Sequence, residues 1–282
     1  MRRYSCKSLF LLVLRVFKSK KALALPATFL ILFVSTLGLI SVTYYFAVEK
    51  VNARSQSLKV STAKQDFLAV DDCVLAVAWQ PGSVRTLELG DSGGKLCVEP
   101  SRGTLFIRVT GGQDINQTVF AQTVGYVVYQ LPYSESPDTG LYLKGDSRSI
   151  VNQSGSLLSQ VSIQHGVEHP ELLLRYRPLV SSIASGAGGS LPVNVVRIYV
   201  VNLNSSENIA LYGRIPLKIS CYSNKIITTT YTVSYKLTCL TVNSFLDESS
   251  GQVTVPISSS EGGAVINVEV VESNVKIERC LR

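Results

Sequence analysis

The chain begins its folded part with an uninterrupted apolar run. Residues 22–48, ALALPATFLILFVSTLGLISVTYYFAV, contain no charged side chain. As a helix at about 1.5 Å per residue, this run reaches about 40 Å, more than the ~30 Å hydrocarbon core of a bilayer. A cleavable secretory signal has an apolar region of only ~7–15 residues. The run therefore predicts a transmembrane helix over residues 23–48.

A helical pattern continues over residues 49–80. An apolar stripe recurs there at three- and four-residue spacing: Phe67, Val70, Val74, Val77 and Ala78. Such spacing places side chains on one face of a helix. No glycine or proline lies between Gly38 and Pro81, so we expect one continuous helix from about residue 23 to about residue 79. Its second half, outside the membrane, would lay the stripe on a folded domain.

Residues 81–282 have the sequence pattern of a β-rich domain. Runs rich in Val, Ile, Thr and Tyr are separated by Gly, Pro, Asn and Ser, which is typical of strands and turns. The expected strands are Val84–Leu89, Lys95–Val98, Thr104–Val109, Val119–Leu131, Val193–Leu203, Ile209–Tyr222, Ile226–Val242, Val253–Ile257 and Ala264–Arg279. Residues 181–190, SSIASGAGGS, predict a loop. The fold class is α+β, with a long N-terminal transmembrane and amphipathic helix and an antiparallel, sandwich-like head.

Positive charge is concentrated at the N-terminus. Residues 1–21 hold seven of the 27 Lys and Arg residues and no acid, which leaves 20 basic and 20 acidic side chains elsewhere. Because cytoplasmic flanks of membrane helices are enriched in Lys and Arg, residues 1–22 are expected to be a cytoplasmic leader and the head to be extracellular. No basic cluster occurs past residue 65, so nucleic acid is not an expected partner.

The segment Gly90–Gly94, GDSGG, matches the sequence around the nucleophilic serine of trypsin-like proteases. Such a serine needs a histidine base and an orienting carboxylate. Both histidines of the chain, His165 and His169, follow Ser92, whereas the histidine precedes the serine in trypsin-like enzymes. Asp and Gly suit a tight turn, so we interpret the segment as the turn of a hairpin between the strands on either side.

The two histidines have the spacing H-x-x-E-H of inverzincin zinc proteases, in which a helix places both rings on one face. Gly166 and Pro170 disfavour a helix, so a loop is expected. The chain contains neither a C-x-x-C pair nor a phosphate-binding loop. We therefore expect a protein that is not an enzyme, without catalytic residues, metal or cofactor. A surface hydrolase would require a convergent pocket around these histidines.

Two pairs of neighbouring acids, Asp71-Asp72 and Asp247-Glu248, are the remaining candidates for acid–base chemistry. Adjacent side chains point apart on a helix or strand, so the members of a pair do not converge on one substrate. The pairs predict helix caps or solvated faces.

Five cysteines fall in the extracellular part, where disulfides persist. Cys73 with Cys97 and Cys221 with Cys239 are the candidate disulfides, although sequence alone does not fix connectivity. Cys6 would be cytoplasmic and reduced. Three triplets have the N-glycosylation pattern, beginning at Asn116, Asn152 and Asn204.

Residues 18–48 carry a basic pair, Lys20-Lys21, followed by Ala22 and an unbroken apolar helix. This arrangement resembles the class III signal of archaeal type IV pilins and archaellins. The resemblance implies cleavage between Ala22 and Leu23 by a prepilin-type peptidase, with the apolar helix retained on the mature protein. Residues 76–96, with a Trp-x-Pro-Gly-Ser turn and a Gly-Gly turn, look like those of an uncharacterised group of archaeal pilin-like proteins.

The resemblance implies a pilin-like cell-surface structural subunit. Its partners would be the lipid bilayer, the peptidase, and copies of itself or other pilin-like subunits. The alternative is an uncleaved, single-pass adhesin or ligand-binding protein in which the same helix is a permanent anchor. The N-terminus of the mature protein discriminates between the two.

Overall fold

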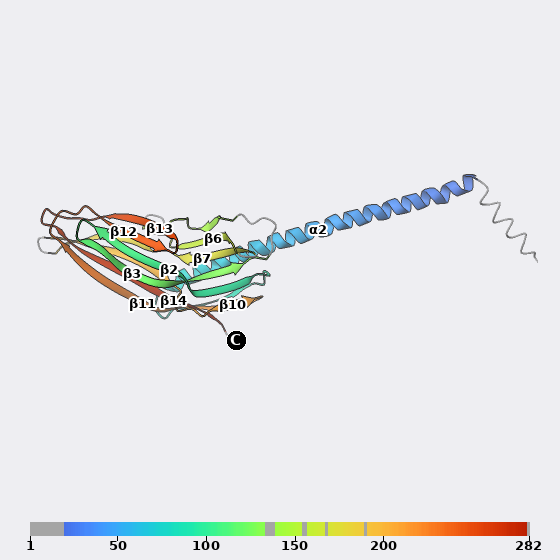
Figure 1. Cartoon of the computed structure of the whole chain (residues 1–282). Helices are drawn as coiled ribbons and strands as arrows, with labels where there is room; N and C mark the ends of the chain where they lie inside the picture. Colours follow the sequence, from blue (N-terminus) through green and yellow to red (C-terminus); the bar gives the residue numbers. More distant parts are fainter. Residues whose placement is uncertain (1–19, 133–138, 154–156, 167–168, 189–190, 281–282) are drawn as a thin grey trace, which may run out of the picture. The chain divides into compact units, whose positions relative to one another are not determined.

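A computed structural model describes residues 20–132, 139–153, 157–166, 169–188 and 191–280. The chain divides into two compact units, Met1–Gln56 and Ser57–Arg282; the second unit is called the head below. The helix α2 spans Lys20–Ala78 without interruption and contributes to both units (Figure 1). The expected long N-terminal helix followed by a β-rich domain is confirmed. Most of the proposed leader, with Cys6, lies outside the described residues.

The helix begins earlier than the sequence suggested. A helix that begins at about residue 23 would have Pro26 in its first turn, where a missing N–H is harmless. Because α2 starts at Lys20, Pro26 instead lies inside the helix. Proline has no backbone N–H, so Pro26 cannot donate the helical hydrogen bond to the carbonyl of Ala22.

Over its described residues, the head contains two sheets. One has six strands in the order β1-β11-β14-β9-β8-β5, and the other has the order β13-β12-β2-β3-β7-β6-β4, with β10 pairing β2. The strands are β1 (Val84–Leu89), β2 (Lys95–Gly111), β3 (Ile115–Gln130), β4 (Tyr142–Lys144), β5 (Val151–Asn152), β6 (Ser159–His165), β7 (Pro170–Tyr176), β8 (Leu179–Gly188), β9 (Leu191–Asn202), β10 (Ile209–Tyr212), β11 (Ile215–Val233), β12 (Cys239–Leu246), β13 (Ser249–Pro256) and β14 (Ala264–Arg279).

The pairing is not antiparallel throughout. β14 runs parallel to β9, from Val265 opposite Val193 to Asn274 opposite Asn202, and β5 runs parallel to β8. The other strand pairs are antiparallel. A parallel neighbour requires a crossover rather than a hairpin, and here the chain between β9 and β14 passes through both sheets.

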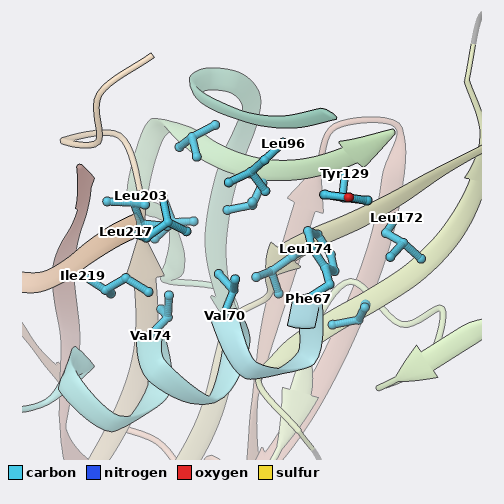
Figure 2. Packing of buried hydrophobic residues seen from close by; sticks show 14 of the residues in the cluster. Phe67, Val70, Val74, Leu96, Tyr129, Leu172, Leu174, Leu203, Leu217 and Ile219 are labelled. Carbon is cyan, nitrogen blue, oxygen red and sulfur yellow. The ribbon is translucent and has the colours of Figure 1, made fainter. Parts of the chain in front are cut away.

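Two hydrophobic clusters fill the head. In the first, the last turns of α2 pack against strands of both sheets. Figure 2 shows Phe67, Val70 and Val74 pointing from α2 toward a group of buried residues of the head: Leu96, Tyr129, Leu172, Leu174, Leu203, Leu217 and Ile219. The predicted stripe is confirmed, since all five of its members are buried. Burial of each large apolar side chain contributes roughly 1.5–3 kcal/mol.

The second cluster joins the two sheets without the helix. From Ala264 to Glu272, β14 alternates between buried and half-buried positions, and its inward side chains Ile266, Val268 and Val270 belong to the same cluster as Ile107 and Val109 of β2. This alternation is the period-2 pattern of a strand with one covered face. The sandwich arrangement of the two sheets stays a prediction.

Two expectations about local structure were wrong. Residues 181–190 were expected to form a loop, but residues up to Gly188 belong to β8, which pairs with β9. Backbone pairing outweighs the low strand propensity of Gly and Ser here. The GDSGG segment does not close a hairpin either: β1 pairs with β11 and β2 with β3, so the segment connects the two sheets.

Candidate functional site

The part of α2 that is apolar enough to cross a membrane carries only uncharged side chains from Pro26 to Val48, here called the anchor segment. Every one of these side chains is exposed within the chain itself. Among soluble proteins such a continuous apolar surface is rare, and it requires lipid or another helix to cover it. The anchor segment is therefore the first element of the candidate site.

Serine and threonine side chains within the anchor segment form hydrogen bonds to the helix itself. The hydroxyls of Ser35 and Thr36 donate to the carbonyl of Leu32, both at 2.9 Å. The hydroxyls of Ser41 and Thr43 donate to carbonyls one turn earlier, at 2.9 and 2.8 Å. Because a polar group without a partner is costly in hydrocarbon, this internal bonding makes the segment compatible with a bilayer.

A buried carboxylate lies at the other end of α2, inside the head. Asp71 follows Val70 in the buried stripe and its exposed fraction is 0 %. Its two oxygens accept hydrogen bonds from the Ser159 hydroxyl and the Tyr176 hydroxyl, each at 2.9 Å. The ammonium of Lys144 lies 2.6 Å from the Asp71 carboxylate. The charge is thus paired and hydrogen-bonded, as a buried carboxylate requires.

The ionisation of this cluster follows from its surroundings. Burial and the neighbouring Asp71 raise the pKa of Tyr176 well above its ordinary value, so the phenol stays neutral. Burial opposes the charge on Lys144, but its hydrogen bonds to Asp71 and Asp72 outweigh that effect and raise its pKa. The Asp72 side chain is mostly exposed, as expected for a solvated acid. The same expectation was wrong for Asp71, whose side chain is buried. The arrangement fixes α2 in the head and offers no vacant acid–base group.

A second polar cluster lies close by along β6 and β7. Arg177 is fully buried and donates to the carbonyls of Leu157 and Arg148, at 3.0 and 2.9 Å, and to Asp146. The side chains of Arg148 and Arg177 hold the pKa of Asp146 well below its usual range. Arginine suits this position because its planar fork bonds several oxygens at once. The cluster ties the loops around β6 to the sheet.

A small apolar pocket opens near the end of α2. Trp79, Leu158, Leu179 and Tyr199 line a volume of about 260 Å³. The rings of Trp79 and Tyr199 meet edge to face, with centroids 5.5 Å apart. Trp79 remains 38 % exposed, so the pocket is reachable from outside. With no charged group among these lining residues, the pocket could take an apolar moiety.

In the described part of the chain, no hydrogen bond joins Ser92 to His165 or His169. His165 ends β6, opposite Pro170 at the start of β7, so the histidine pair flanks a hairpin turn rather than lying on a helix. The His165 ring hydrogen-bonds the Thr139 hydroxyl at 2.8 Å. Ser92 is buried in the loop between sheets. Over the described residues, no group of three or more His, Cys, Asp or Glu side chains could hold a metal ion.

Neither candidate disulfide appears among the described residues, so both pairings stay predictions. Five cysteines are free thiols in the described part of the chain: Cys73, Cys97, Cys221, Cys239 and Cys280. Cys73 packs against the first cluster and Cys97 belongs to the second, because strand alternation turns Cys97 away from its helix-facing neighbours. Cys221 is buried in β11, and Cys239 is exposed in β12 of the other sheet. Cys97 lies in β2, which the sequence predicted to form a hairpin with β1, but these two strands belong to different sheets.

The candidate modification sites differ in accessibility. Asn116 in β3 and Asn152 in β5 are exposed, whereas Asn204 is half-buried. The hydroxyl of Ser206, which completes the Asn204 triplet, is buried and accepts a hydrogen bond from the Ile277 amide at 3.0 Å. The Asn204 triplet therefore belongs to a packed turn, which is a poor acceptor once the head has folded.

The cleavage position implied by the resemblance lies in the described backbone. Ala22 and Leu23 both fall near the start of α2.

The sequence patterns predicted the anchor segment and the apolar stripe. They did not predict the roles of Asp71 and Arg177, because the partners of these residues are distant in the chain. No protein-family model, curated protein or solved structure matches this chain.

Proposed function

We propose that this chain is a pilin-like cell-surface structural subunit, held in a lipid bilayer by the anchor segment with its head outside the cell. One observation carries the proposal: a single helix is uncharged and exposed at one end, while its other end forms part of a folded core. Exposed apolar side chains favour lipid or the same segment of another copy. Asp71 and its three partners hold the last turns of the helix in the head.

The order of charge and apolarity supports the topology. Seven positive residues precede the anchor segment, and the remainder of the chain has no net charge. Under the positive-inside rule the N-terminus is cytoplasmic and the head extracellular. The head is proposed to be a sandwich of its two sheets, since both contribute side chains to the second cluster.

Removal of the leader between Ala22 and Leu23 is the step that would release the subunit for assembly. Pro26 supports this position because it cannot donate the helical hydrogen bond to the Ala22 carbonyl. A peptide bond must leave regular helical geometry to enter a protease site, and the missing bond lowers the cost of doing so. A prepilin-type peptidase is the proposed partner for this step.

The test is the N-terminus of the mature protein, measured by mass spectrometry on protein from native membranes. A chain that starts at Leu23 supports the pilin-like subunit. Ala22→Phe should block cleavage, since the peptidase is expected to read a small residue there. Ala24→Phe, two residues further, is the matched control and should leave cleavage intact. An intact N-terminus in the unsubstituted protein would contradict leader removal.

One observation favours the alternative of an uncleaved, membrane-anchored binding protein. The pocket lined by Trp79, Leu158, Leu179 and Tyr199 is open and apolar, as a site for part of an adhesion ligand would be. An intact N-terminus together with lost adhesion in Trp79→Ala would support this reading. External protease added to intact cells tests the topology common to both proposals, because the head should be digested.

A further inference from the structure

β11 is longer than the strand that covers its outer edge. β1 pairs with β11 only from Ile215 to Ser220, whereas β14 pairs with its inner edge from Leu217 to Val233. In the described ranges, no strand pairs with the outer edge over Ser223–Val233, and no loop reaches it with a backbone hydrogen bond. We call this stretch the free edge of β11, which lies beside β14 (Figure 1). Unpaired amides and carbonyls at such an edge are a template for another strand.

The composition of the free edge favours pairing. Its sequence, SNKIITTTYTV, ends in eight consecutive β-branched or aromatic residues, Ile226–Val233, the residue types enriched in strands. Lys225 is its one charged residue, and it contains neither proline nor glycine. Ile226 is 64 % exposed, and Tyr222, just before the free edge, is 72 % exposed. Such a long edge of strand-forming residues is rarely left uncovered in a protein that works as a single copy.

Three of the outermost strands are blunted in ways that the free edge is not. β5 has two residues and β4 has three, which gives a partner little to pair with. β13 has eight residues but ends in Pro256 and contains Gly251. Short strands and proline are devices that prevent edge-to-edge pairing. The contrast indicates that pairing at β11 is tolerated or used.

We propose that the free edge of β11 pairs antiparallel with the same edge of a second copy of this chain, around a two-fold axis. A pairing centred on Thr228 matches all eleven residues of the free edge. It sets Ile226 opposite Thr230 and Lys225 opposite Tyr231 of the other copy. No charge then faces a like charge, and β-branched residues face each other, which are the favourable cross-strand pairs. The same patch on both copies is what a two-fold interface requires.

The inner face of the free edge supports the same occupant. Ile227 and Tyr231 pack against the second cluster but are only half-buried. Tyr231 also donates to the Gln117 side chain of β3 at 2.8 Å, so the edge is held in place before any partner arrives. A second copy of β11 would place its own Ile227 and Tyr231 beside these residues and extend the cluster. A preformed edge lowers the ordering cost of association.

The proposed pairing rests on the proposed function in one respect, namely that the copies share one membrane. The contact lies in the head and does not require leader cleavage. The experiment uses the full chain in detergent micelles, with mass measured by analytical ultracentrifugation over a concentration series. The variant Thr228→Lys/Thr230→Lys adds positive charge at two exposed positions of the free edge. Thr228→Glu/Thr230→Glu adds the opposite charge. Gln252→Lys/Thr254→Lys is the matched control, on exposed positions of β13.

The unsubstituted chain and the β13 control should form dimers of equal affinity. Each variant of the free edge alone should dimerise about tenfold more weakly, because like charges then face across the pair. An equimolar mixture of the Lys and Glu variants should regain the dimer, which unfolding or anchor-segment contacts would not produce. A monomer at every concentration, or equal dimers in all variants, would overturn the proposal. Either result leaves the N-terminal test of the proposed function unaffected.

Discussion

The Asp71 carboxylate of α2 accepts a hydrogen bond from the Tyr176 hydroxyl of β7 at 2.9 Å, and both groups are buried. These two residues are separated by 105 positions in the sequence. Their contact joins the end of a helix to the sheet against which it packs. A carboxylate is an unusual choice for a core position, so its removal gives the most direct measure of how the head holds the helix.

Replacement of Asp71 by Ala should destabilise the head by about 3–5 kcal/mol, because Lys144 then loses its buried partner and two hydroxyls lose their acceptor. Asp72→Ala is the matched control, since the Asp72 side chain is 72 % exposed and also contacts Lys144, at 2.8 Å. It should cost less than about 1 kcal/mol. Urea unfolding followed by tryptophan fluorescence measures both. Equal losses would mean that burial of Asp71 does not matter.

Alkaline pH should weaken the head. The folded state raises the pKa of Tyr176 through burial and Asp71, and that of Tyr126 through burial and a hydrogen bond to Asp247. Above pH ~10 the unfolded chain releases protons that the folded protein keeps, so stability falls as pH rises, by up to ~1.4 kcal/mol per pH unit for each group. Urea midpoints between pH 8 and 11 measure the slope.

In Tyr176→Phe one of these groups is gone, so the alkaline slope should be shallower although the variant is less stable at pH 8. Tyr222→Phe is the control, because Tyr222 is 72 % exposed and should leave the slope unchanged. An identical slope in Tyr176→Phe and the unsubstituted protein would show that Tyr176 is not protected from ionisation by the fold.

Gly125 in β3 marks a close approach between the sheets. A Cβ built there would lie 2.7 Å from the carbonyl oxygen of Leu203, closer than real atoms come. Gly125→Ala should therefore lower stability by about 1–3 kcal/mol through displacement of backbone. In Gly262→Ala the added methyl meets its neighbours at ordinary distances, from 3.7 Å, and stability should change little. Thermal unfolding compares the two, and similar midpoints would contradict the close packing.

Thiol chemistry checks the cysteine assignment. Cys239 is exposed and should react first with iodoacetamide in the folded protein. Burial raises the pKa of Cys97 and of Cys73, so little reactive thiolate forms at neutral pH and both should label slowly. Peptide mapping without reductant gives the order. A linked Cys73–Cys97 or Cys221–Cys239 peptide would contradict the free thiols.

The sequence predicted a strand correctly where the residues of that strand alone carry the pattern. β1 and β14 occupy the expected residues, Val84–Leu89 and Ala264–Arg279, because alternation and flanking turns define each of them. The hairpin of β6 and β7 was missed; its polar residues, such as Gln160 and Arg175, pair with each other through a side-chain hydrogen bond of 2.7 Å. Such pairs form only after both strands are in place, so neither strand shows a clear apolar pattern alone.

The residues of the candidate site also fall into two groups, those that the sequence predicted and those that it did not. The anchor segment and the buried stripe follow from hydrophobicity and helical spacing, which one stretch of sequence contains. Asp71 was taken for a solvated acid because its partners, Lys144, Ser159 and Tyr176, lie 73 to 105 positions later. The parallel pairing of β9 with β14 was missed for a related reason. No local signal tells a strand which distant strand will be its neighbour.

The position of β14 also affects the order of events during synthesis. Ribosomes deliver the chain from the N-terminus, so the anchor segment emerges first and β14 follows every other strand described here. Yet β14 lies between β11 and β9, which cannot meet without it. Strand edges of a half-made sheet invite aggregation. Under the topology proposed above, β9 and β11 would cross the membrane before β14 can join them, and a holding chaperone on the far side would protect their unpaired edges.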